Sequence, residues 1–283
     1  MDRAPPAADE LAALCAGDAM WERMRAEAQD AIALDPSLTQ LFLGFVLNRA
    51  SFEEAVAYRV SARLGGAAID ADLIANAFLS ATQKDAALGE AFRADIAAFV
   101  ERDPACKRLI EPLLYFKGFH AIEAYRLAHF LWREGKRDFA LYVQSRTSDA
   151  LAADIHPAAR FGKGIFLDHA TGLVVGETAV VEDDVSILQN VTLGGSGKAA
   201  GDRHPKVRRG VMIGAGAKIL GNIEIGSCSR IAAGSVVLQA IPRNSVVAGV
   251  PARVVGTETC AEPARDMDQI LRGLAYDGFD YVI

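Results

Sequence analysis

The chain has 283 residues, of which 51% are hydrophobic and 23% are charged, and its formal net charge is −6. This length is ample for two domains with buried cores and a tail, which is the organisation we expect. The negative net charge and the lack of a basic patch argue against a nucleic-acid partner.

The amino terminus and the cysteines indicate the compartment. Met1 to Pro6 lack the basic start and apolar run of a secretory signal, and no uncharged stretch approaches the roughly 18 residues of a membrane span. Cys15, Cys106, Cys228 and Cys260 show no C-x-x-C spacing, so we expect neither a zinc knuckle nor a disulfide framework. We therefore predict a soluble cytoplasmic protein with reduced thiols, no metal and no membrane association.

The first half of the chain has a helical pattern. Residues 1 to about 152 are rich in Ala, Leu, Glu and Arg, and their apolar positions recur at the three- and four-residue spacing of helices. Ser51 to Glu54 resembles a capping box that opens a helix. Phe119 to Arg133 places its apolar side chains broadly along one side, which predicts a helix that Gly135 ends.

After Leu151 the apolar residues recur every six positions, which is an internal repeat. The apolar positions fall into three registers: Ile155, Phe161, Leu167 and Leu173; Val175, Val181, Ile187 and Leu193; Val207, Ile213, Ile219, Ile225, Ile231 and Val237. A three-sided coil of short parallel strands has this period, with one hexad on each side and residues three hexads apart stacked. We therefore expect Ile213 beneath Ile231.

A β-sandwich with Gly-rich turns is the alternative fold, because strands of about 4–8 residues look similar in a short window. Its turns would recur every 8–12 residues or so rather than at a fixed period of six. The sequence therefore predicts an α+β protein with three parts. These are a helical amino-terminal domain at 1–152, a left-handed parallel β-helix at 153–256, and a mobile, partly helical tail at 257–283.

Two interruptions of the repeat carry candidate functional residues. His169 comes two positions after the apolar Leu167, so its imidazole should point outward, where it suits general-base work; the alternative is a solvated histidine without a role. Gly194 to Pro205 forms a loop with Arg203 and His204 at its tip, and such loops on rigid scaffolds are frequently functional. This loop lacks the spacing and context of a P-loop, which argues against nucleotide hydrolysis.

Several segments together resemble one family. They are Asp154 to Pro157, Asp168 to Gly172, Val175 to Val180, Gly201 to Lys206 and Ala248 to Ala252, with Asp103-Pro104-Ala105 and Pro112 to Tyr115 upstream. The set resembles the serine acetyltransferases, which are hexapeptide-repeat enzymes that catalyse the first step of cysteine biosynthesis. The resemblance covers about residues 90 to 256 closely. The Ala248 to Ala252 motif is common to hexapeptide acyltransferases, whereas the histidine motifs with the upstream segments are more specific.

The resemblance implies a reaction and a base. The family transfers the acetyl group of acetyl-CoA to the hydroxyl of L-serine and releases O-acetyl-L-serine and CoA. A serine hydroxyl is a weak nucleophile near neutral pH, so this chemistry needs a positioned base, and His169 matches the family's base. Asp154 matches the carboxylate that orients this imidazole, although it could merely form the turn before Pro157. No cysteine or serine lies in a recognisable nucleophile motif, which favours direct attack over an acetyl-enzyme.

The resemblance also implies binding residues. Arg203 would bind the carboxylate of serine with His204 beside it, while Asp103 and Asp168 would bind the ammonium group. Each of these residues could instead belong to a surface ion pair. For acetyl-CoA, the matching positions are Gly195, Ser196, Ala215, Arg230, Ala233 and Arg253.

The family also forms assemblies. Its coils associate as trimers with active sites between neighbours, and the helical halves join two trimers into a hexamer. The chain ends in Ile283, and this end resembles the tails that insert a terminal isoleucine into O-acetylserine sulfhydrylase. Feedback inhibition by L-cysteine at the serine site is a further hypothesis.

Three other functions remain open at this point. A γ-type carbonic anhydrase would hold zinc through three histidines, for which His156, His169 and His204 are available, but their spacing does not fit that class well. Another acyltransferase acting on a sugar or an antibiotic would share the scaffold. A non-catalytic binding protein would keep the repeat but would not need an outward histidine with a matching carboxylate.

Overall fold

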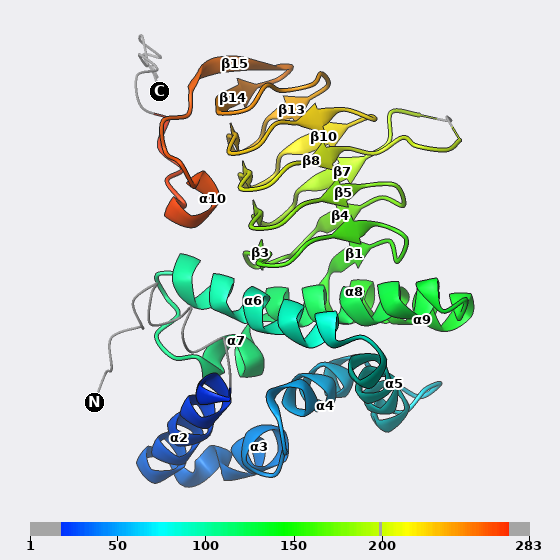
Figure 1. Cartoon of the computed structure of the whole chain (residues 1–283), viewed down its shortest axis with the longest axis vertical. Coiled ribbons are helices and arrows are strands. Elements are labelled where there is room, and N and C mark those ends of the chain that lie inside the picture. The colour runs from blue at the N-terminus through cyan, green and yellow to red at the C-terminus, as the bar shows by residue number, and fades with distance from the viewer. Residues whose placement is uncertain (1–17, 198–199, 272–283) are drawn as a thin grey trace, which may run out of the picture.

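The computed structural model describes residues 18–197 and 200–271, and it shows a helical layer beneath a stacked coil of short strands (Figure 1). Cys15 and Ile283 lie outside the described residues. The helical layer comprises α2 (Ala19–Leu34), η1 (Pro36–Leu38), α3 (Thr39–Phe42), η2 (Leu43–Leu47), α4 (Phe52–Leu64), α5 (Ala71–Lys84), α6 (Ala86–Arg102), α7 (Ile110–Tyr115), α8 (Lys117–Arg133) and α9 (Arg137–Leu151). Among the described residues, no helix is long and apolar enough to cross a membrane.

The predicted helix start and helix end are both confirmed. α4 begins after Ser51, whose side-chain oxygen accepts a hydrogen bond from the Glu54 amide at 3.2 Å, while the Glu54 carboxylate accepts one from the Ala50 amide. These bonds satisfy amides that the first turn of a helix leaves without a partner. α8 ends at Arg133, and Gly135 follows with a φ of +77°, which glycine adopts without steric penalty.

The coil is the predicted parallel β-helix. Its strands are β1 (Ala153–Ile155), β2 (Arg160–Phe161), β3 (Phe166–Leu167), β4 (Leu173–Val175), β5 (Val180–Val181), β6 (Ser186–Ile187), β7 (Thr192–Gly194), β8 (Lys206–Val207), β9 (Met212–Ile213), β10 (Lys218–Leu220), β11 (Glu224–Ile225), β12 (Arg230–Ile231), β13 (Val236–Val237), β14 (Ser245–Gly249) and β15 (Ala252–Thr257). They form sheet A (β1-β4-β7-β10-β13), sheet B (β2-β5-β8-β11) and sheet C (β3-β6-β9-β12-β14-β15), with β14 and β15 antiparallel.

The hexad positions stack inside the coil as expected, with one local departure. Ile213 pairs with Ile231, which confirms the predicted step of three hexads. Ile155, however, pairs with Val175 rather than with Leu173. The cause is the turn between β3 and β4, which is two residues longer than a six-residue step and therefore shifts the register. This longer turn carries His169.

The three sheets differ in what covers their outer faces. On sheet C the outward residues Phe166 and Ser186 are buried. Phe99 of α6 packs edge-on against Phe166, with 4.9 Å between the ring centroids, and Ser186 donates a hydrogen bond to the Ala264 carbonyl. Ala264 belongs to α10 (Pro263–Asp266), which lies beside the coil in Figure 1. On sheet A, α9 contacts the outer face at β1 through Gln144 and Asp154, whereas Val174 on the next strand is 42% exposed.

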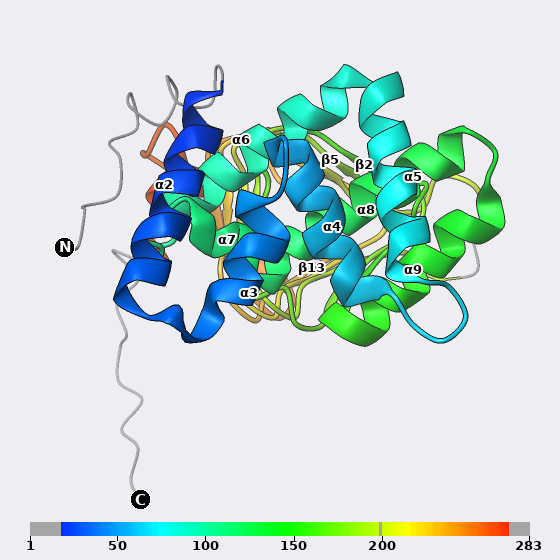
Figure 2. The same ribbon diagram turned by 90° about the horizontal axis from the view of Figure 1, so that it is seen from below.

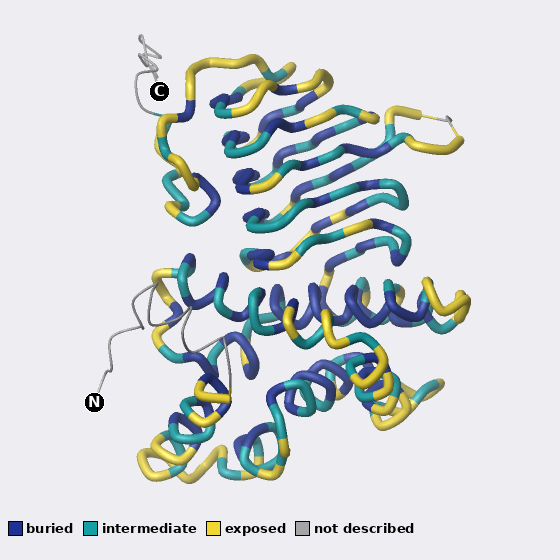
Figure 3. The backbone as a smooth tube through the Cα atoms, viewed as in Figure 1, coloured by how far each residue is buried: buried dark blue, intermediate teal, exposed yellow. Residues whose placement is uncertain are grey.

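The helical layer closes the lower end of the coil. Seen from below in Figure 2, the helices lie across the stacked strands, and Figure 3 shows buried residues on the facing sides of α6 and α8 and along the coil interior. α8 approaches β3 closely at Gly118, where an added Cβ would lie 1.9 Å from the Leu167 carbonyl oxygen. A glycine is therefore required where the helical layer meets the strand that leads into the His169 turn.

Candidate active site

The turn between β3 and β4 presents His169 to solvent. The imidazole is 73% exposed, and its Nε2 lies 3.7 Å from an Asp168 carboxylate oxygen. His169 and Ala170 both have a φ of +55°, a left-handed conformation that costs free energy outside glycine and that often marks functional turns. Lys117, the first residue of α8, binds the Thr171 hydroxyl and ties this turn to the helical layer.

Asp103 of the helical layer joins this turn. Burial raises the pKa of the Asp168 carboxyl, the nearby His169 opposes this rise, and the charge of Asp103 adds to it. Asp103 follows Arg102, the last residue of α6, whose guanidinium donates hydrogen bonds to the Gly164 carbonyl at 3.0 Å and to the Ser186 hydroxyl at 3.1 Å. The anchoring of Arg102 on the coil explains how Asp103 comes to lie near Asp168. The structure therefore places Asp103 within electrostatic range of Asp168, which adjoins His169.

Asp154 occupies a different position, on the outer face of sheet A. Its Oδ1 accepts a hydrogen bond of 2.7 Å from the Gln144 side chain of α9. Within the described residues no hydrogen bond or ion pair joins Asp154 to His169. A single chain thus places the expected base and its expected orienting carboxylate on neighbouring elements without direct contact.

The Arg203 and His204 pair forms a second cluster, at the edge between sheets A and B. Arg203 pairs through Nη2 with the Glu177 carboxylate at 2.8 Å, and Nδ1 of His204 lies 2.8 Å from the Thr178 hydroxyl. His156, which precedes β2, lies close enough for its charge to interact with Glu177 and Arg203. Burial lowers the pKa of His204, and repulsion from Arg203 lowers it further.

The small residues expected to contact acetyl-CoA lie in two places. Ala215 and Ala233 lie at the edge between sheets C and A, the same edge as the His169 turn, and the Gly234 amide donates to the Ala215 carbonyl one coil below it. Gly195 and the exposed Ser196 begin the loop after β7. A ligand along the edge above His169 would meet small side chains.

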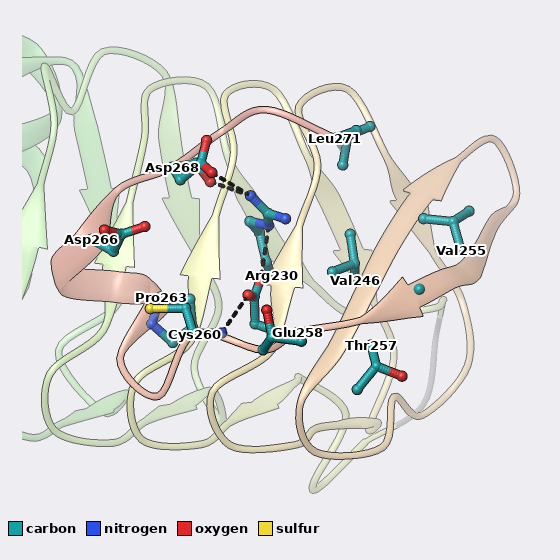
Figure 4. A pocket seen from close by; sticks show the side chains of 12 residues that line it. Arg230, Val246, Val255, Thr257, Glu258, Cys260, Pro263, Asp266, Asp268 and Leu271 are labelled. Atoms are coloured by element: carbon teal, nitrogen blue, oxygen red, sulfur yellow. Dashed lines mark hydrogen bonds and ion pairs between the residues drawn. The ribbon is translucent and has the colours of Figure 1, made fainter. Parts of the chain in front are cut away.

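Arg230 and Arg253 lie apart from that edge. Arg230 projects from sheet C and is covered by residues 258–271. Its Nε lies 2.9 Å from the Glu258 carboxylate, and its Nη1 donates to the Asp268 carbonyl (Figure 4). The same Nη1 also donates to the Ile270 carbonyl. A pocket of about 480 Å³ adjoins it. Arg253 lies on β15 and is exposed. Arg230 is therefore held by the chain itself, and a phosphate would have to displace these partners.

Sequence reasoning missed three residues that the structure places beside the candidate ones. Glu177 stood inside the Val175 to Val180 segment, but nothing in one sequence marks it as the partner of Arg203. Gln144 and Lys117 lie in the helical half, where helical periodicity carries no signal of a polar contact with the coil. Among the described residues, no group of three or more His, Cys, Asp or Glu side chains is arranged to hold a metal ion.

The coil of six-residue repeats, with an outward imidazole and two acidic side chains at its edge, defines a hexapeptide-repeat acyltransferase. Residues 204–239 match the family model for the bacterial transferase hexapeptide (six repeats), and residues 20–124 match that for the serine acetyltransferase N-terminal region. The serine acetyltransferase of Salmonella typhimurium is 48% identical over 262 residues, which are 93% of this chain and 96% of the relative. The chain belongs to the serine acetyltransferase family and is an acyltransferase.

Solved structures agree with this membership. The serine acetyltransferase of Brucella abortus in complex with coenzyme A is 55% identical, covers 87% of this chain and 99% of its own, and has a TM-score of 0.85. A serine acetyltransferase in complex with cysteine is 48% identical, covers 89% of this chain and 98% of its own, and has a TM-score of 0.87. This membership decides against the carbonic anhydrase and the non-catalytic alternatives.

Proposed function

We propose that this chain transfers the acetyl group of acetyl-CoA to the hydroxyl of L-serine by direct attack, the first step of cysteine biosynthesis, in the cytoplasm. The observation that carries the proposal is that Asp103 of the helical layer lies within electrostatic range of Asp168, which adjoins His169 on the β3–β4 turn. Two carboxylates suit an ammonium group, and an exposed imidazole suits the removal of a hydroxyl proton. The Brucella abortus complex with coenzyme A supports acetyl-CoA as the donor.

In this mechanism His169 accepts the serine hydroxyl proton as the oxygen attacks the thioester carbonyl. The imidazolium then returns a proton to the departing CoA sulfur, so that His169 is regenerated. Asp154 orients the imidazole in the assembled enzyme, and Gln144 holds one oxygen of this carboxylate in place.

The separation of the two clusters supports a trimer. The His169 turn leads into the strands of sheet A, whereas the Arg203 loop leaves the far end of β7, and a three-residue strand spans about 10 Å. One serine is too small to contact both edges of one coil. We propose that the edge with His169 faces the edge with Arg203 of a neighbouring subunit, and that the helical domain joins two such trimers. We also propose that residues 1–152, 153–256 and 257–283 are the functional units of the chain.

A direct assay tests the proposed reaction. We expect release of CoA from acetyl-CoA with L-serine as the acceptor, measured by a thiol reagent, and much slower release with a sugar acceptor. Product identity is checked by mass spectrometry as O-acetyl-L-serine. Faster release with a sugar than with serine would support the alternative acyltransferase and overturn the proposal.

Replacing Arg203 by alanine should chiefly weaken serine binding. Charge-assisted hydrogen bonds to a carboxylate contribute about 1.5–3 kcal/mol, so we expect KM for serine to rise on the order of ten- to hundredfold, with KM for acetyl-CoA unchanged. Arg203→Lys should recover only part of this loss because it cannot donate two parallel bonds. Steady-state kinetics with each substrate varied distinguish these outcomes; an unchanged KM for serine in Arg203→Ala would refute the assigned role.

Two regulatory partners follow from the family resemblance. We propose that L-cysteine competes with serine, which the cysteine complex of a relative supports, and that Ile283 binds O-acetylserine sulfhydrylase. Deletion of Ile283 should abolish co-elution with the sulfhydrylase while acetyltransferase activity stays intact. Equal co-elution of the full and shortened chains would exclude the partner.

A further inference from the structure

Thr178 forms four short contacts with the loop that carries the second cluster. Its hydroxyl oxygen accepts hydrogen bonds from the backbone amides of Arg203 at 3.0 Å and of His204 at 3.1 Å. The same oxygen lies 2.8 Å from Nδ1 of His204, and the Thr178 backbone amide donates to that nitrogen at 3.1 Å. One short side chain therefore joins the returning end of the loop to the coil.

These contacts determine which ring nitrogen of His204 carries the proton. A backbone N–H can only donate, so Nδ1 must accept the bond from the Thr178 amide and cannot itself carry hydrogen. The two acceptor positions of the Thr178 hydroxyl are already filled by the loop amides, so its single hydrogen is available to Nδ1 of His204 at 2.8 Å and to the nearby Asp202 carboxylate. The proton of the neutral ring must then be on Nε2.

The surroundings keep the ring neutral and fixed. His204 is 6% exposed, and a Cβ at Gly176 would lie 1.9 Å from Nε2, so the ring has no room to turn away on that side. Burial opposes a positive imidazolium at His204, and the charges of Arg203, Lys206 and His156 repel it, while the Glu177 carboxylate favours it. A doubly protonated ring would also lose the amide bond at Nδ1.

We propose that Thr178 is a positioning residue that fixes His204 as a neutral donor through Nε2–H and sets the backbone of Arg203 beside it. This inference rests on the proposed function, because it assigns His204 the part of a hydrogen-bond donor toward an oxygen of the bound serine. His204 then cannot act as a base, since one nitrogen is occupied and the other is protonated. The proton transfer remains with the exposed His169.

Two substitutions of Thr178 separate the hydroxyl from the shape. Thr178→Val keeps the size but removes three of the four contacts, and we expect KM for serine to rise at least tenfold, with a smaller change in kcat and no change in KM for acetyl-CoA. Thr178→Ser keeps the hydroxyl and should stay within about threefold of the wild type. The control is Thr147→Val, which removes a buried hydroxyl elsewhere in the chain. The Thr147 hydroxyl donates to the Val143 carbonyl within α9, so this variant shows the effect of a threonine-to-valine change away from the site.

Nitrogen-15 NMR of the histidine rings reads the tautomer directly, with the His204 signals assigned by their absence in His204→Asn. In the wild type at pH 7 we expect one tautomer, protonated at Nε2. In Thr178→Val the backbone amide at position 178 can still donate to Nδ1, but the loop loses its three contacts with the hydroxyl. We therefore expect a second population in which the loop has moved away and the ring takes the other tautomer or the charged form. A wild-type ring protonated at Nδ1, or a KM for serine in folded Thr178→Val within twofold of the wild type, would overturn the proposal. If the wild type did not acetylate serine, the proposed function would fail, but the NMR measurement of the His204 tautomer would still test whether Thr178 positions this ring.

Discussion

Replacing His169 by alanine should lower kcat for serine acetylation by about a hundredfold to ten-thousandfold, the usual contribution of a positioned general base. The substitution removes the group that accepts the hydroxyl proton, and the remaining contacts bind both substrates without activating the nucleophile. The measurement is the steady-state rate with saturating serine and acetyl-CoA. The KM values should change far less than kcat, because the lost interaction belongs to the transition state.

The fold of this variant should be unaffected. The imidazole is 73% exposed, and its Nε2 lies 3.7 Å from the Asp168 carboxylate, so little packing is lost. The thermal midpoint and the oligomeric state should therefore match those of the wild type. A folded His169→Ala enzyme with wild-type kcat would remove His169 from the mechanism and would direct attention to His156 near the other cluster.

The repeat itself could be predicted because its cause is local. Each hexad places one apolar side chain inside the coil, and this pattern is readable in the sequence without any knowledge of distant contacts, as the pairing of Ile213 with Ile231 shows. The longer turn at His169 is visible only as a change of register between Leu173 and Val175. The cover over sheet C could not be predicted, because Arg230 is held largely by backbone carbonyls, which any sequence offers.

The candidate site could be predicted only in part, for a related reason. Motif resemblance selected Asp103 and Asp168, and the structure places them near each other although 65 positions separate them (168 − 103). The partners of these residues follow from tertiary contacts such as Gln144 with Asp154, which leave no periodic signal. The separation of His169 from Arg203 by the width of sheet A has no sequence signature either, because it concerns which edge of the coil a loop leaves.

Replacing Arg126 by methionine should destabilise the junction between the helical layer and the coil by about 3–5 kcal/mol, the usual cost of leaving a buried charge without its partner. Arg126 of α8 donates to the Asp95 carboxylate at 2.6 Å and to the Gly162 carbonyl at 2.8 Å. Asp95 is fully buried and also accepts a bond from the Ile165 amide of the coil. Burial raises the pKa of both Asp95 and the adjacent Glu123, and the rise is large for Glu123, whereas Arg126 and backbone amides oppose it at Asp95. Asp95 is therefore the carboxylate that Arg126 balances.

The measurement is the free energy of unfolding in urea. Lys84→Met is the control, because Lys84 pairs with Glu134 on the surface, where their side chains are 55% and 42% exposed, respectively. Such a surface pair contributes about 0–1 kcal/mol.

A double-mutant cycle with Asp95→Asn separates the two causes of instability, since the neutral amide leaves no charge to orphan. If the loss came from packing alone, Arg126→Met would cost the same in both backgrounds. If the loss comes from the orphaned carboxylate, the cost falls sharply when Asp95 is already neutral. We expect the second result, because Arg126 and Asp95 are held in place by the coil backbone and neither charge can reach water without opening the junction.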